Sequence, residues 1–252
     1  MQTRETVFRY WASRFECDVS LFATPGSTVV PVEPMRNDGT LYLYRIDQHA
    51  VLRCDPLLAR RISECLPDAS STLESSAARE LFGSVFKHEG DHPHFYLDAA
   101  DFVPTSAPSN IHMRRLAAEE YALLDPFLEQ CSETDVEWAD IERDNHDPVI
   151  ICGFDTSQHD SPLVAYASFR TLTNYGGDPQ YGDQIGDVGV LIRPDCRSHG
   201  LGRAVVSAQS RWCLDHGVVP QYQVLATHEH SYRIPVALGY RPLLTVSAFS
   251  ST

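Results

Sequence analysis

The sequence lacks the features that mark membrane and secreted proteins. No apolar run reaches the roughly 18 residues that a membrane-spanning helix needs, and the opening residues, MQTRETVFRYW, contain no apolar core of a signal peptide. No pair of cysteines has the C-x-x-C spacing, and seven cysteines is an odd number. We therefore expect free thiols and a cytoplasmic location, where disulfide bonds are rare.

Basic residues are scarce, and Lys87 is the only lysine of the sequence. The formal net charge of −14 argues against nucleic acid and against an anionic membrane surface as partners. The charge is uneven, however, because residues 186–252 hold six arginines against four acidic residues. A basic region within an acidic chain is what a polyanionic ligand would require.

Two known phosphate-binding motifs are absent as well. The sequence G-x-x-x-x-G-K-[ST] does not occur, and Val205 stands where a dinucleotide-binding G-x-G-x-x-G loop would have its third glycine. Histidines and carboxylates crowd residues 88–94, but their spacing matches no metal motif. Because Gly90 and Pro93 interrupt this stretch, we predict a polar surface loop there and no bound metal.

The length of 252 residues suits one large domain or two of ordinary size. Pro104 to Ser109 reads as a linker. We therefore predict an N-terminal α/β domain of unknown role over residues 1–105 and a second domain over residues 110–252. In the first, apolar periodicity predicts helices at 4–16, 57–66 and 72–82 and strands at 28–32, 41–46, 50–53 and 95–97.

The second domain shows alternating strand and helix patterns. The patterns predict strands at 111–116, 148–154, 163–172, 188–192, 221–226 and 241–249, and helices at 117–124, 133–142, 201–217 and 231–238. One junction is the most informative, because an apolar strand ends near Pro194 and leads through Gly200 and Gly202 into an apolar helical stripe.

Such a turn can bind an anion. The first amides of a helix have no internal partners, and the helix dipole adds partial positive charge there. Gly200 and Gly202 leave room for a phosphate to approach the backbone, and Arg197 and Arg203 add full charges. The alternative is a plain glycine turn with solvated arginines.

The motif Arg-x-x-Gly-x-Gly after a strand resembles the pyrophosphate loop of the GNAT superfamily of acyl-CoA N-acyltransferases. A second stretch, from His228 and Ser231 to Ala237-Leu238-Gly239-Tyr240, is similar to the family's Asn-x-x-Ser…Leu-Gly-Phe/Tyr pattern, with His228 in place of Asn. The resemblance covers roughly residues 110–252. It implies an α/β fold with a GNAT-like mixed central sheet flanked by helices, preceded here by the smaller N-terminal α/β domain.

The order of predicted elements follows the GNAT fold up to its final strand, which we expect to be missing. We therefore predict that residues 1–105 complete the sheet or line the acceptor site. The resemblance implies the following acetyl-CoA-binding residues: Val190, Leu191, Ile192, Arg197, Ser198, His199, Gly200, Leu201, Gly202, Arg203, His228 and Ser231.

Acyl transfer to an amine needs a base that takes a proton from the nucleophile, and a backbone N–H that faces the thioester oxygen. In the family a bulge in the strand before the loop supplies this N–H, which maps by resemblance to Val190–Ile192. Asp187 on the same strand is the candidate base, with a solvated strand-end aspartate as the alternative. The family's usual tyrosine acid corresponds to Pro235, so Tyr232 is the candidate acid, or no acid is needed.

The resemblance implies an N-acetyltransferase that uses acetyl-CoA and no metal. A dense acidic stretch over residues 129–147 predicts a cationic acceptor, either a small molecule or a peptide amine; the alternative is a solvated helix face. Because the catalytic positions depart from the family, a non-catalytic acyl-CoA sensor or regulatory module is the alternative function. A homodimer is compatible with the sequence.

Overall fold

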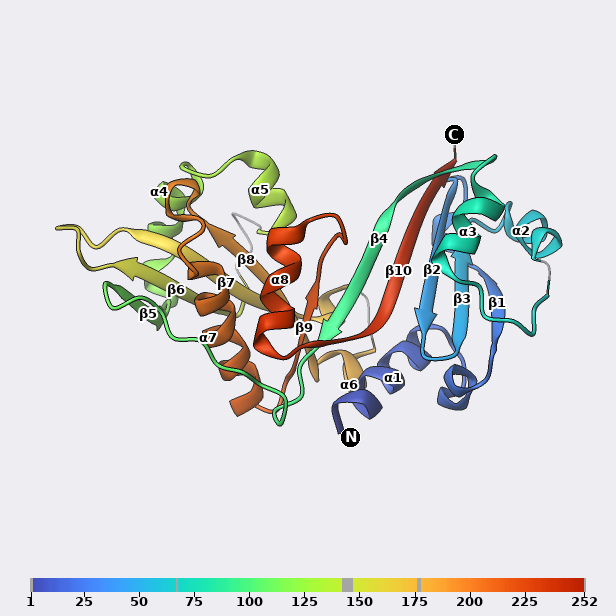
Figure 1. The fold of residues 1–252 in the computed structure, drawn as a ribbon, viewed down its shortest axis with the longest axis horizontal. Helices are drawn as coiled ribbons and strands as arrows, with labels where there is room; N and C mark the ends of the chain where they lie inside the picture. The colour runs from blue at the N-terminus through green and yellow to red at the C-terminus, as the bar shows by residue number, and fades with distance from the viewer. Residues whose placement is uncertain (1, 67, 142–146, 176–177, 252) are drawn as a thin grey trace. The chain divides into compact units, whose positions relative to one another are not determined.

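The computed structural model of the protein describes residues 2–66, 68–141, 147–175 and 178–251. The chain forms two units, and each combines segments that are distant in the sequence (Figure 1). The first unit contains residues 1–95, 223–232 and 242–252, and the second contains residues 96–222 and 233–241. The division into domains over residues 1–105 and 110–252 stays a prediction.

The first unit is built around a sheet in which the strand order is β1-β3-β2-β10-β4. Its elements are α1 (Gln2–Arg14), β1 (Gly26–Pro31), β2 (Thr40–Ile46), β3 (His49–Cys54), α2 (Ala59–Cys65), α3 (Ser75–Phe82), β4 (Phe86–Tyr96) and β10 (Arg241–Ser251). Strand β1 runs parallel to β3, whereas β2 is antiparallel to both β3 and β10. Apolar residues of α2 and α3, including Ile62 and Phe82, cluster with Leu43 and Phe249 of the strands.

Strand β4 corrects the prediction of a loop over residues 88–94. Gly90 and Pro93 are local signals for a loop, yet the backbone stays extended through both residues. The neighbouring strand β10 supplies partners that no local pattern reveals: the Ser247 hydroxyl donates to Asp91 at 2.6 Å. Tertiary pairing therefore overrides the local preference in this stretch.

Removing residues 1–105 should abolish the solubility of the remaining chain. Strand β10 lies between β2 and β4, and both neighbours belong to the removed segment. Residues 106–252 alone would thus expose two unpaired edges of an 11-residue strand, and such edges promote aggregation. Size-exclusion chromatography of this fragment should show aggregates, with the full chain as control. A soluble, monomeric and fully active fragment would contradict the prediction.

The second unit contains a sheet with the strand order β9-β8-β7-β6-β5. Its elements are β5 (Ile111–Arg115), α4 (Leu124–Leu128), α5 (Glu133–Trp138), β6 (Val149–Asp155), β7 (Leu163–Thr171), α6 (Pro179–Gly182), β8 (Ile185–Ile192), α7 (Leu201–Asp215) and β9 (Val219–Gln223). Helix α8 (Glu229–Leu238) is shared by the two units, because its residues 229–232 belong to the first and its residues 233–238 to the second. Strands β5 to β8 pair antiparallel, and β9 joins β8 in parallel.

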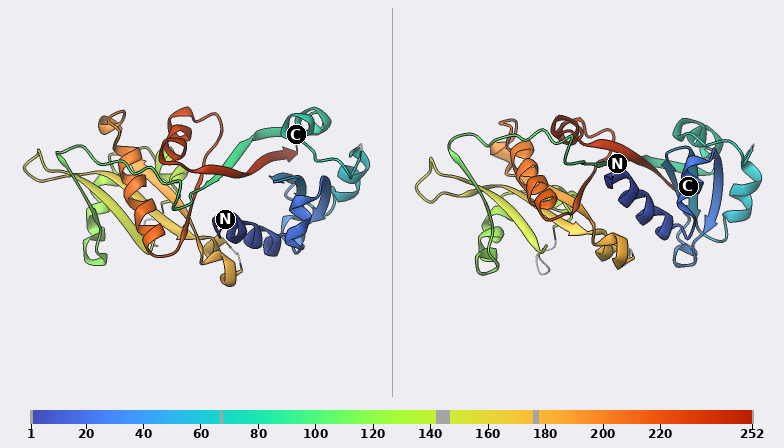
Figure 2. Two further views of the ribbon diagram at one scale, coloured as in Figure 1. Left: turned by 60° about the horizontal axis from the view of Figure 1, so that its bottom comes forward. Right: turned by 90° about the horizontal axis from the view of Figure 1, so that it is seen from below.

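Helices cover both faces of this second sheet, as the two views of Figure 2 show. On one face, Leu201 and Val205 of α7 pack against Val164 and Ala167 of β7. On the other face, the cluster around Phe127 of α4 includes residues of α5 and of the strands. The fold is therefore the predicted α/β arrangement of a mixed sheet flanked by helices.

One predicted helix of this unit has a different form. Residues 118–123 form a 3₁₀ helix, and the α-helix α4 begins only at Leu124. The Glu120 carboxylate accepts two hydrogen bonds from Arg114, both at 2.7 Å, and one from the Ala117 N–H at 3.0 Å. These contacts fix the tight turn.

Across the described residues, no helix combines the length and the apolar character that crossing a membrane demands.

Candidate functional site

Helix α7 begins with free backbone amides. Gly200 precedes its first residue with φ of +79°, and Ser198 also has a positive φ of +68°. The first helical hydrogen bond is donated by the Ala204 N–H to the Gly200 carbonyl at 3.1 Å. No side chain caps the helix start, and within the described residues the N–H groups of residues 201–203 have no acceptor. The turn therefore presents amides that can bind an anion.

The two arginines of the turn differ in their contacts. Arg197 donates from Nε to the Ile192 carbonyl at 3.2 Å and from Nη2 to Asp135 at 2.9 Å. This ion pair joins the turn to α5, and hydrogen bonds from Ser132 and Arg197 lower the pKa of Asp135. Arg203 is exposed and has no ion pair within the described part of the chain. Arg203 is thus the freer cation of the two.

Strands β8 and β9 separate next to this turn. Their parallel pairing covers three residue pairs and ends where Asp187 pairs with Gln221. Strand β8 continues for five further residues, to Ile192, and its pairing with β7 is unbroken along this whole length. The separation leaves a fork between β8 and β9. Beyond the fork, over residues 188–192, one edge of β8 is not paired with β9.

The backbone of β8 beyond the fork offers donors on the open edge. The Arg193 N–H donates to the Val164 carbonyl of the β7 side at 3.0 Å. Because successive residues of a strand direct their N–H groups to opposite edges, Leu191 also faces β7, whereas Val190 and Ile192 face the open edge. The predicted bulge in β8 is wrong, since the β7–β8 register shows no shift. Strand separation, without a bulge in the β7 pairing, leaves the N–H groups of Val190 and Ile192 without a β9 partner.

Asp187 lies at the fork and is buried, with 8% of its surface exposed. This excludes the alternative of a solvated aspartate at a strand end. The Gln221 side-chain amide of β9 donates to Asp187 Oδ1 at 3.0 Å. On the other side, Arg170 of β7 is directly opposite Asp187 in the sheet. The predicted base thus lies among polar side chains within the sheet.

Arg170 is held by further carboxylates. Its Nε donates to Asp147 at 2.7 Å, and its Nη1 lies 3.5 Å from an oxygen of Asp140. Asp147 also accepts a hydrogen bond from Ser168. Arg170 and Gln221 are not among the site residues predicted from the sequence. Their signal was a polar side chain within an otherwise apolar strand, which is costly to bury unless it has partners.

The other predicted residues lie in the first unit. Tyr232, the candidate acid, packs its ring edge-on against Phe95 with 5.2 Å between ring centroids. The Tyr232 N–H donates to the His228 carbonyl at 2.9 Å, so Tyr232 lies in the first turn of α8 and His228 directly precedes that helix. Burial lowers the pKa of His92, and the nearby His228 contributes to this shift. The roles of His228, Ser231 and Tyr232 in binding or catalysis stay predictions.

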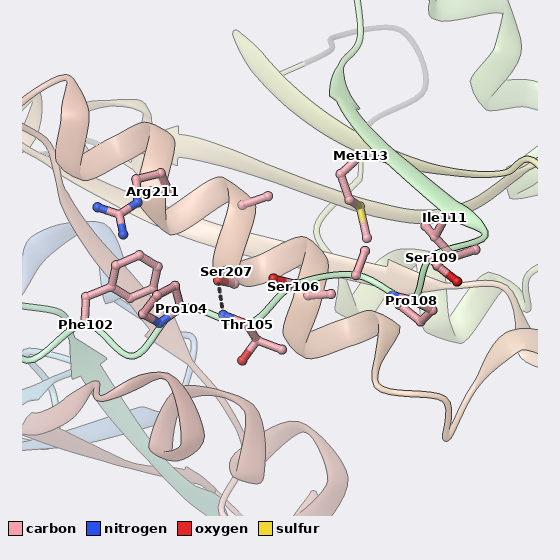
Figure 3. A pocket seen from close by; sticks show the side chains of 13 residues that line it. Phe102, Pro104, Thr105, Ser106, Pro108, Ser109, Ile111, Met113, Ser207 and Arg211 are labelled. Carbon is pink, nitrogen blue, oxygen red and sulfur yellow. Dashed lines mark hydrogen bonds between the residues drawn. The ribbon is translucent and has the colours of Figure 1, made fainter.

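A pocket of about 490 Å³ lies along the side of α7 (Figure 3). The segment before β5 forms one wall, where the Thr105 N–H donates to the Ser207 hydroxyl at 2.9 Å. The Arg211 guanidinium stacks over the Phe102 ring at 4.6 Å from its centroid. None of the predicted site residues lines this pocket.

Among the described residues, no group of histidine, cysteine and carboxylate side chains is arranged to hold a metal ion.

Comparison with protein families gives one match. The model of the "Acetyltransferase (GNAT) family" matches residues 112–240, which is more than half of the chain. No match was found among curated proteins.

Solved structures resemble the chain at low sequence identity. A GCN5-related N-acetyltransferase from Kribbella flavida is 18% identical with a TM-score of 0.48, covering 70% of this chain and 64% of its own. A GNAT-family acetyltransferase from Colwellia psychrerythraea is 11% identical with a TM-score of 0.49, covering 92% and 94%. A fungal GH3 beta-N-acetylglucosaminidase with a GCN5-related glucosamine N-acetyltransferase region is 13% identical with a TM-score of 0.50, covering 98% and 36%. The chain spans less than two thirds of the Kribbella flavida protein, and these likenesses concern the fold alone.

Proposed function

The chain belongs to the GNAT acetyltransferase family, and we propose that it transfers an acetyl group from acetyl-CoA to a primary amine. The observation that carries this proposal is the free helix start of α7 beside the fork between β8 and β9. The first feature suits the pyrophosphate of acetyl-CoA. The second offers backbone N–H groups along which the thioester arm would lie.

The proposed reaction forms a C–N bond and breaks the C–S bond of the thioester. The amine loses one proton, and Asp187 is the proposed acceptor of that proton. The thioester oxygen gains negative charge as the amine attacks, and the N–H of Val190 or Ile192 faces the edge where that charge would develop. The departing thiolate takes up a proton, from Tyr232 or from water.

A sensor that binds acyl-CoA without turnover is the second candidate. The residue that supports this alternative is Pro235, which stands at the position of the family's usual tyrosine and is buried in α8. The two functions differ in one product. Incubation with acetyl-CoA and an amine should release free CoA thiol if the chain is an enzyme. Binding of acetyl-CoA without thiol release from any amine would favour the sensor.

We propose further that the acceptor is cationic. Of the acidic residues near α5, Asp135 is paired with Arg197, and Asp140 and Asp147 contact Arg170. Glu133 and Glu137 are exposed, lie one turn apart on α5, and have no ion pair within the described ranges. These two carboxylates are therefore available to a second positive charge on the acceptor.

A panel of amines should show preference for diamines over monoamines of equal length. Changing Glu133 and Glu137 together to glutamine should raise KM for a diamine roughly two- to fivefold, since exposed ion pairs contribute little. KM for a monoamine should stay unchanged. Glu80→Gln, which removes an exposed carboxylate from α3, is the matched control. Preference for neutral or anionic acceptors would contradict this part of the proposal.

Replacing Arg197 by alanine should weaken acetyl-CoA binding by about 1.5–3 kcal/mol, the range for a hydrogen bond to a charged group. Calorimetric titration would measure the change. Asp135→Asn is the informative control, because it removes the ion pair of Arg197 and keeps the guanidinium. Binding by Asp135→Asn should be equal or tighter. If Asp135→Asn weakens binding as much as Arg197→Ala, the arginine supports the turn and does not bind phosphate.

A further inference from the structure

Three polar side chains form a row across the sheet at the fork. Arg170 of β7, Asp187 of β8 and Gln221 of β9 are consecutive partners in the strand registers. Partners in register point to the same face of a sheet. All three are buried, with exposed fractions of 9%, 8% and 2%. The row therefore places the carboxylate of Asp187 between an arginine and a side-chain amide.

The amide of Gln221 is only half satisfied. Its Nε2 donates to Asp187 Oδ1 at 3.0 Å, whereas its Oε1 is buried and has no hydrogen-bond partner within the described structure. Burying an unsatisfied carbonyl oxygen costs stability. An apolar side chain at this position would avoid that cost. The contact that distinguishes Gln221 from an apolar residue is the hydrogen bond to Asp187.

The arginine on the other side is anchored separately. Arg170 Nε donates a hydrogen bond to Asp147, which is itself buried and lies outside the row. This contact fixes the position of the guanidinium. Asp140 also contacts Arg170, at 3.5 Å. The buried Tyr240, which follows the end of α8, also lies near Asp187. Its pKa is raised by burial and also by the charge of Asp187. Arg170, Tyr240 and Gln221 are thus among the polar groups that surround Asp187.

We propose that Gln221 is a positioning residue, which holds the carboxylate of Asp187 ionised and oriented at the fork through its side-chain N–H. Arg170, fixed by Asp147, supplies the opposite charge. This inference rests on the proposed function, because it assigns Gln221 to the group that would accept the amine proton. A hydrogen bond donated to a carboxylate stabilises its charged form. Losing that bond should therefore raise the pKa of Asp187.

The structure offers a matched control for this substitution. Gln209 of α7 is also fully buried, and its Oε1 also lacks a hydrogen-bond partner among the described residues. Its Nε2 lies 4.0 Å from the Cys213 sulfur, and no hydrogen bond joins it to Asp187 within the described structure. Gln209→Leu thus makes the same chemical change in a buried site away from the row. A purely structural effect of losing a buried glutamine would appear in both variants.

The experiment follows the titration of Asp187 directly. In full-length protein with ¹³C-labelled aspartate, the Asp187 carboxyl signal is assigned by its loss in Asp187→Asn. In Gln221→Leu its pKa should rise by about one to two pH units, the equivalent of a hydrogen bond to a charged group. In Gln209→Leu it should not move. The acidic limb of the kcat profile should shift with the signal, while the Kd for CoA stays unchanged.

Two outcomes would overturn the proposal. One is an unchanged Asp187 titration in Gln221→Leu, and the other is an equal shift in Gln209→Leu. If Gln221→Leu does not fold, Gln221→Met keeps a similar length without the amide and gives the same test. The NMR titration needs no turnover. A shift in Gln221→Leu together with a wild type that releases no thiol would uphold the positioning role and reject the proposed function.

Discussion

Gly202→Glu should abolish acetyl-CoA binding. Gly202 lies in the first turn of α7, where the free amides of residues 201–203 would meet the pyrophosphate. A glutamate there adds bulk and a negative charge where the phosphates would lie, so Coulomb repulsion replaces attraction by the helix start. Calorimetric titration with acetyl-CoA should give no measurable heat of binding, and circular dichroism should show a folded protein.

Gly202→Ala separates charge from bulk. A Cβ at this position would lie 3.1 Å from the terminal Cδ1 of Ile234 and 3.7 Å from Ile192 Cγ1. A flexible side-chain end can move by the few tenths of an ångström required, so alanine should fold and retain most of the affinity. Unchanged affinity in Gly202→Glu would end the assignment of this turn to the pyrophosphate. Loss of folding in both variants would instead assign Gly202 to the packing of α7.

The turn before α7 could be predicted from the sequence because its signals are local. An apolar strand, Pro194, two glycines and a helical stripe follow each other within a short stretch, and each has a direct conformational meaning. The structure adds that Gly200 takes the left-handed conformation at the helix start. This is a conformation that glycine adopts without strain.

The fork and the row around Asp187 could not be predicted in the same way. Where β8 and β9 separate depends on the register of two strands that are joined through the whole of α7. Arg170 and Gln221 reach Asp187 only through that register. Likewise, the ion pair of Arg197 joins residues 62 positions apart in sequence. No local pattern encodes such pairings.

Strand β4 shows the opposite failure, in which local signals are present and mislead. Gly90, Pro93 and several polar side chains favour a loop. The strand forms because β10, which follows in the sequence only after residue 240, places hydroxyl groups against its carboxylates: Ser247 bonds Asp91 and Ser250 bonds Glu89. These two carboxylates are thereby satisfied, which removes the usual cost of placing them in a sheet.

Asp187→Asn should lower kcat by a factor of about 10² to 10⁴, the range for loss of a general base. Asparagine has nearly the same shape, and its side-chain oxygen can still accept the hydrogen bond that Gln221 donates to Asp187. The fold and the Kd for acetyl-CoA should therefore be retained. Asp183→Asn, an exposed aspartate just before β8 that accepts a hydrogen bond from Thr173 at 2.7 Å, is the control and should keep wild-type kcat.

The pH dependence distinguishes a base from a structural carboxylate. At high pH a growing fraction of the amine is already neutral, so the reaction depends less on a base. The difference in kcat/KM between wild type and Asp187→Asn should therefore shrink as the pH approaches the pKa of the acceptor amine. A loss that is constant across the pH range would mean that Asp187 supports the sheet at the fork, with Arg170 and Gln221 as its partners. Water would then be the remaining group that can take the proton from the amine.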